Sequence, residues 1–174
     1  MKCCNCKHVD LEPKELEHGL LAAVCPSCHS SLLPLMNYRY WSERSHEVSN
    51  ISTELAEETS GAKQCPKCQR LMSKFKLGVA TKNRLELCGH CDEVWLDTGE
   101  WDLVKKLDLH EKLSSVFTDA WQRNILKQRE ASSLRDHYSQ VLGEKDFEKV
   151  NEFKLWLDKH PKRAEIKHYI TINF

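Results

Sequence analysis

Four cysteines near the middle of the chain have the residue type and spacing of a metal site. They form two Cys-x-x-Cys pairs, Cys65 with Cys68 and Cys88 with Cys91, with nineteen residues between the pairs. Two tight turns of this kind each offer two thiolates to one ion, and four thiolates in a tetrahedron are a typical ligand set for zinc. We therefore predict a structural zinc site here, with a redox dithiol or an iron site as the alternatives.

The N-terminal part of the chain repeats this arrangement. Two further Cys-x-x-Cys pairs are separated by eighteen residues and predict a second structural Zn²⁺ ion held by Cys3, Cys6, Cys25 and Cys28. Cys4 is the one cysteine outside the two groups, and it is an alternative ligand in place of Cys3 or Cys6. Three histidines lie next to ligands and are further alternatives: His8, His29 and His90.

A zinc ion held by four cysteines has no open coordination position and is not a catalytic centre. The thiolates fill all four positions, so no place is left for water or a substrate. The ion instead stabilises the fold, by about 10 to 16 kcal/mol in small zinc peptides. Gly89 is expected to supply the positive φ of its turn, and the first site, which has Ser27 and His29 around Cys28, is expected to be less regular.

The rest of the sequence gives no support for an enzyme. It has no Gly-rich phosphate loop, no His-Glu-x-x-His and no Gly-x-Ser-x-Gly. The 174 residues carry 26 basic and 26 acidic side chains, so net charge indicates no partner, and the mean hydropathy is -0.59. No apolar stretch has the length of a membrane span or the form of an export signal. We expect a cytoplasmic protein with no membrane partner and no small-molecule substrate, and a reducing compartment favours metal ligands over disulfides.

The predicted fold class is α+β, with two small zinc β-ribbons followed by an α-helical region. The first ribbon covers residues 1–41, with a bend at His18 and Gly19, and Tyr38 and Trp41 are expected to cover its metal site. Residues 42–62 form an acidic linker, with a short helix over 51–58 as an option. This linker would let the ribbons move relative to each other unless partners or packing fix them. The second ribbon covers residues 63–99, with a hairpin over 71–87 and a last strand at 94–96.

Residues 100–174 have helical periodicity. Asp97 is expected to cap a first short helix, with Glu100 reaching back to it. A longer helix is predicted from Thr118 or Asp119 to a stop at Gly143, a third over 147–157, and a fourth over 162–170 after Pro161.

The second ribbon also carries the one feature that points to a partner. Seven cations without an intervening acidic residue are candidate contacts to DNA or RNA phosphates: Lys63, Lys67, Arg70, Lys74, Lys76, Lys82 and Arg84. The alternative is that they balance the thiolates and the acidic residues of the same ribbon. Trp95 and Trp101 are predicted to be core residues and not base-stacking platforms. The rival function is a protein–protein interaction adaptor without nucleic-acid binding.

The second cysteine group and its flanks resemble the bacterial zinc ribbons grouped as the transcription factor IIB-type zinc-finger family. The resemblance covers about Gln64 to Trp101 and rests on Cys-Pro-Lys-Cys, Cys-Gly-His-Cys and the tail Trp-Leu-Asp-Thr-Gly-Glu ending at Glu100. The first group resembles a second copy of this pattern, and the copy is degenerate because it lacks the tail. The resemblance implies a zinc-ribbon fold, zinc as ligand, and a role at nucleic acid or the transcription machinery.

Overall fold

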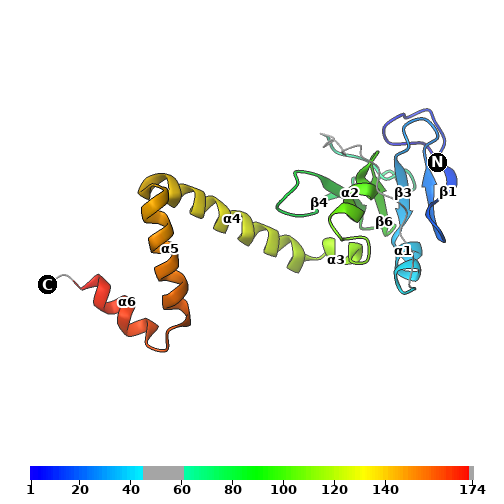
Figure 1. Cartoon of the computed structure of the whole chain (residues 1–174). Helices are drawn as coiled ribbons and strands as arrows, with labels where there is room; N and C mark the ends of the chain where they lie inside the picture. Colours follow the sequence, from blue (N-terminus) through cyan, green and yellow to red (C-terminus); the bar gives the residue numbers. More distant parts are fainter. Residues whose placement is uncertain (45–60, 173–174) are drawn as a thin grey trace. The chain divides into compact units, whose positions relative to one another are not determined.

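The computed structural model describes residues 1–44 and 61–172 (Figure 1). The chain divides into two compact units, Met1–Leu126 and Lys127–Phe174. The described part is mixed helix and antiparallel sheet, which agrees with the α+β class. The helix considered over 51–58 and most of the acidic linker lie outside the described residues, and the four-part division of the sequence stays a prediction.

The first unit is built on one six-stranded antiparallel sheet. The N-terminal segment supplies β1 (Glu12–Glu17), β2 (Leu20–Val24) and β3 (Ser31–Pro34). The second ribbon supplies β4 (Ser73–Lys76), β5 (Arg84–Cys88) and β6 (Glu93–Leu96). The strand order is β1-β2-β3-β6-β5-β4. The bend between β1 and β2 falls at His18 and Gly19, as predicted, with Gly19 at φ 80°.

Strands β1–β3 and strands β4–β6 are joined edge to edge, so packing fixes the two segments that a linker alone would let move. β3 pairs with β6 over four residues, with Leu32 opposite Trp95 and Leu33 opposite Val94. All four residues of β6 are buried. With β5 at its other edge, β6 is an inner strand, and its two faces are covered by the two cores described next.

The two faces of this sheet carry two separate cores, because successive side chains on a strand point to opposite faces. Leu33 and Val94 pack on one face with α1 (Leu35–Ser42), α2 (Glu100–Lys106) and α3 (Leu113–Val116). Leu32 and Trp95 pack on the other face, against the cysteines of both groups.

The aromatic residues of α1 belong to the helical core and not to the metal face. Tyr38 and Trp41, which the sequence placed over the first metal site, lie 6.2 Å apart between ring centroids. Trp41 also meets Trp101 of α2 edge to face at 6.0 Å. The α1 helix begins directly after Pro34, the last residue of β3, and its buried side chains lie on the same side of the sheet as Leu33. Trp95 takes the metal-covering place instead.

The C-terminal helices follow the predicted boundaries closely. They are α4 (Asp119–Leu142), α5 (Glu144–Lys159) and α6 (Arg163–Thr171). Thr118 caps α4 by accepting a hydrogen bond from the Trp121 N–H at 3.3 Å, and Gly143 ends it at φ 76°. Among the described residues, none of the helices combines the length and the apolar character that crossing a bilayer requires.

A buried ion pair fastens the first ribbon to the helices. The carboxylate of Glu17 on β1 accepts hydrogen bonds from the Trp101 indole N–H and the Lys105 ammonium, both at 2.9 Å. The Lys105 side chain is 3 % exposed and also pairs with Asp102 at 2.9 Å. Breaking a buried pair by removing one member leaves the other charge poorly solvated.

We predict that Glu17→Ala lowers the free energy of unfolding by about 3 kcal/mol, because it removes a carboxylate from a buried ammonium and an acceptor from a buried indole. Urea unfolding of zinc-loaded protein followed by tryptophan fluorescence measures this. Glu12→Ala, at the exposed start of the same strand, is the control, and it should change stability by less than about 0.5 kcal/mol. Equal effects of the two substitutions would contradict the role given to Glu17.

Candidate metal centres

All four Cys-x-x-Cys turns have the same backbone geometry. In each one the N–H after the second cysteine donates to the carbonyl of the first cysteine, at 2.8 to 2.9 Å, in the pairs Lys7 to Cys3, His29 to Cys25, Gln69 to Cys65 and Asp92 to Cys88. The same four donors have a positive φ, between 56° and 62°. The positive φ therefore falls after the second cysteine and not at Gly89, which corrects that expectation. The first site is as regular as the second.

The turns are placed by the sheet. Cys25 follows the last residue of β2 and Cys88 is the last residue of β5, so the second turn of each group connects two neighbouring strands. The first turn of each group is closed by an isolated bridge, Lys2 to Asp10 in one ribbon and Gln64 to Leu71 in the other. Each ribbon thus brings two loops together at one end of its strands.

The sulfur atoms are spaced for one tetrahedral ion. In each group the four Sγ atoms lie within 4.8 Å of one another. Three of the Sγ–Sγ distances are 3.6 Å for Cys3–Cys28, 3.9 Å for Cys6–Cys25 and 3.6 Å for Cys68–Cys88. A tetrahedron with Zn–S bonds of about 2.3 Å has sulfur atoms about 3.8 Å apart. The donor set and its spacing therefore fit zinc at both groups.

The alternative ligands lie outside the two groups. Each group consists of cysteines alone, and His8, His29 and His90 have exposed side chains. The Cys4 thiol donates to the carbonyl of Gln64 at 3.0 Å, which directs it away from the first group. In each Cys-x-x-Cys pair the first cysteine is buried and the second is partly exposed.

Each group contains thiols of unequal acidity. The backbone N–H of Arg70 lowers the pKa of Cys68 to about 7, more strongly than burial raises it. Burial raises the pKa of Cys28, but hydrogen bonds from Ser30 and neighbouring sulfurs outweigh it and lower the value to about 7. Burial raises the pKa of Cys3 and of Cys91 to about 12. Zinc binding must displace the protons of the weaker acids, so its affinity falls as the pH falls.

One buried carboxylate connects the Cys3–Cys6 turn with residues that flank the second cysteine group. Asp97, which is 5 % exposed, accepts hydrogen bonds from the Trp95 indole at 2.8 Å and from the Asn5 amide at 2.9 Å. It also forms an ion pair with Lys63. Asn5 lies between the ligands Cys3 and Cys6, and it donates to Ser30 at 2.9 Å as well. Nearby, the Thr98 hydroxyl donates to the carbonyl of Cys28.

These bonds change the role expected for Asp97. Glu100 does reach back, accepting the Asp97 N–H at 2.8 Å, as the capping motif predicts. The residue before α2 is however Gly99, at φ 79° and without a side-chain cap, because the Asp97 carboxylate is used by Trp95, Asn5 and Lys63. No sequence pattern identifies Asn5 or Ser30, because their partners are distant along the chain.

A buried acidic cluster surrounds Lys63. Carboxylate oxygens of Glu86, Asp97 and Glu100 lie within 4.8 Å of one another. Lys63 lies 3.8 Å and Lys74 3.4 Å from Glu86. Burial, above all, raises the pKa of Glu100 from its ordinary 4.5 to about 8. Glu100 therefore holds a proton at neutral pH, which lowers the charge that Lys63 and Lys74 must balance.

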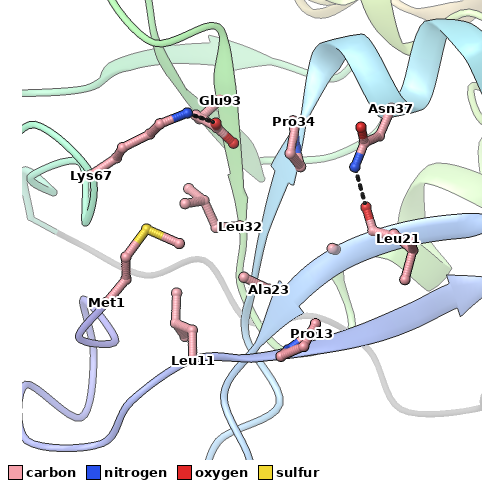
Figure 2. A pocket seen from close by; sticks show the side chains of 11 residues that line it. Met1, Leu11, Pro13, Leu21, Ala23, Leu32, Pro34, Asn37, Lys67 and Glu93 are labelled. Carbon is pink, nitrogen blue, oxygen red and sulfur yellow. Dashed lines mark hydrogen bonds and ion pairs between the residues drawn. The ribbon is translucent and has the colours of Figure 1, made fainter.

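The seven candidate cations divide into two sets. Lys63 and Lys74 pair with buried carboxylates, and Lys67 pairs with Glu93 at 2.9 Å, beside Leu32 (Figure 2). Arg70, Lys82 and Arg84 are exposed and Lys76 is half-buried. Trp95 and Trp101 are both buried, which confirms them as core residues.

Comparisons with models of protein families, with curated proteins and with solved structures give no match to this chain. The two groups of four cysteines are what suggests zinc-ribbon-like sites.

We predict that purified protein contains about two equivalents of zinc, and that the double variant Cys65→Ser and Cys68→Ser contains about one, because two sulfurs are lost from one tetrahedron. Elemental analysis measures the content. Cys4→Ser is the matched control and should keep both ions, since its sulfur binds Gln64. Zinc loss from Cys4→Ser, or less than about two equivalents in the wild type, would contradict the assignment.

The proton on Glu100 predicts a stability that falls as the pH rises. The folded state holds this proton up to about pH 8, whereas the unfolded chain releases it near 4.5, so the stabilisation is complete below about 4.5 and is lost through pH 8. Glu100→Gln keeps a neutral acceptor for the Asp97 N–H and should flatten the slope between about pH 6 and 8, measured by urea unfolding in zinc-saturated buffer. Glu111→Gln, at an exposed site, should keep the wild-type slope.

Proposed function

We propose that this chain is a zinc-ribbon protein of the transcription factor IIB type that acts by recognition and not by catalysis. The support is the donor set: each group supplies four sulfurs to one ion, which fills the tetrahedron and leaves no place for substrate. The motif from Gln64 to Trp101 supports the family. In this proposal both ions stabilise one shared sheet, which then presents a binding surface.

The surface we propose for nucleic acid is the loop end of the β4–β5 hairpin. The observation that carries this proposal is the strand register, which sets Lys76 directly opposite Arg84, with Lys82 in the connection between the strands. Cations at neighbouring positions on two strands can contact the same phosphate or successive phosphates of one backbone, and contacts of this kind carry no sequence preference.

The proposed contact set is smaller than the seven cations of the sequence. Lys63, Lys67 and Lys74 already pair with carboxylates, so moving them to phosphates would leave buried acidic groups without their cations. Arg70 lies beside Cys68, at the other end of β4 from Lys76. A footprint of three or four cations predicts modest affinity and a shallow salt dependence, with a slope of about -3 in log K against log salt.

The test compares two triple variants of equal charge change. Lys76→Ala, Lys82→Ala and Arg84→Ala together should weaken binding to a fluorescent DNA or RNA oligonucleotide at least about tenfold at low salt, as measured by anisotropy. The control replaces three exposed lysines elsewhere in the first unit, Lys14, Lys106 and Lys112, and should bind almost as the wild type does. Equal losses in the two variants, or no wild-type binding at about 20 mM salt, would refute the nucleic-acid surface.

A protein-interaction adaptor is the second candidate. It is favoured by the three ion pairs of Lys63, Lys67 and Lys74, which use part of the basic segment inside the fold. Affinity capture with and without nuclease separates the two functions. Partners that are lost on nuclease treatment support the nucleic-acid proposal, and partners that remain support the adaptor.

A further inference from the structure

The helices of the second unit bury very little apolar surface among themselves. Within residues 127–172 the one buried hydrophobic side chain is Leu157, at 6 % exposure. In proteins most helical stability comes from packing an apolar face against another element, and not from helix propensity. Three helices with this little shared core therefore need a further surface to pack on.

The exposed apolar side chains are arranged as a groove. Ala131, Leu134, Tyr138 and Leu142 recur at three- and four-residue spacing on α4, which places them on one face. Phe147 and Val150 of α5 line the opposite wall. The groove encloses about 630 Å³. Arg135 closes part of it, with its guanidinium 5.7 Å from the centre of the Phe147 ring.

The exposed apolar area is of the size that one partner gives to a stable interface. Eleven large apolar side chains of residues 127–172 are each at least 40 % exposed, namely Leu134, Tyr138, Val141, Leu142, Val150, Phe153, Leu155, Trp156, Tyr169, Ile170 and Ile172. At roughly 100 Å² each they sum to about 1,100 Å² over α4, α5, α6 and Ile172, compared with about 800 Å² per partner in a standard interface. Leu134, Tyr138, Leu142 and Val150 are the four of them that line the groove.

The mixed charges of residues 127–172 favour a second copy of the same chain. Residues 127–172 contain ten Lys and Arg and eight Asp and Glu, with the two signs interspersed, as at Glu144, Lys145 and Asp146. A strongly acidic or a strongly basic partner would meet no surface of opposite charge here. Two identical surfaces of mixed sign can oppose each other without net repulsion, provided that the axis between them is two-fold.

We propose that α4 and α5 form the interface of a homodimer. The apolar face of α4, with Leu134 and Tyr138, packs in the groove of the partner copy against its own equivalent and against α5. Two such helix pairs form a four-helix layer, in which side chains that are exposed in one copy become the common core. The proposal concerns the second unit and is independent of what the hairpin binds.

The test is the mass of the full-length protein in solution, measured by light scattering after gel filtration at about 5 to 100 µM. Wild-type protein should have twice the chain mass, and the double variant Leu134→Glu and Val150→Glu should have the single mass with lower helix content by circular dichroism. Glutamate is as good a helix former as leucine, so loss of the dimer is not a loss of propensity. The control is Met36→Glu, at an exposed position of α1, which should stay dimeric.

Zinc content separates dissociation from misfolding, because the monomeric double variant should keep about two equivalents in its first unit. A wild-type monomer across this concentration range would overturn the proposal. So would a dimer that survives both glutamates. A monomer that purifies at a fixed ratio with a different protein would assign the groove to that protein and would also overturn it.

Discussion

Four sulfur atoms must lie within reach of one small ion at each of two places, and this requirement sets the geometry of the first unit. Each Cys-x-x-Cys turn uses a carbonyl of its first cysteine and a positive φ after its second to hold the sulfurs together. None of those four positive-φ residues is glycine, so each turn carries a backbone cost that metal binding and tertiary packing must offset. The strands β2, β3, β5 and β6 take their directions from these turns.

The shared sheet makes the two metal groups parts of one layer. Pairing of β3 with β6 places Leu32 and Trp95 side by side between the two sets of cysteines. Asp97 then connects the Cys3–Cys6 turn, through Asn5, with Trp95 and Lys63. These bonds hold the first turn against the part of the sheet that carries the second cysteine group.

Some of the charged side chains hold the first unit together by pairing with each other inside it. The chain has equal numbers of acidic and basic side chains, so its net charge indicates no class of partner. Some of its lysines form ion pairs with buried carboxylates. Such buried pairs are costly to assemble but more costly to break, so they fix the position of the groups that they join. The basic residues at the loop end of the β4–β5 hairpin, and the apolar side chains of α4 and α5, are the surfaces from which we infer partners.

The sequence by itself determined the features that depend on neighbours in the chain. These include the cysteine groups, the bend at Gly19, the end of α4 at Gly143 and the burial of Trp95, because spacing, turn residues and periodicity act over a few residues. Only the tertiary structure decided the pairing of β3 with β6, the core that Trp41 enters and the partners of Asp97. Those depend on contacts between residues far apart, such as Asn5 with Asp97 and Glu17 with Lys105, for which a single sequence carries no signal.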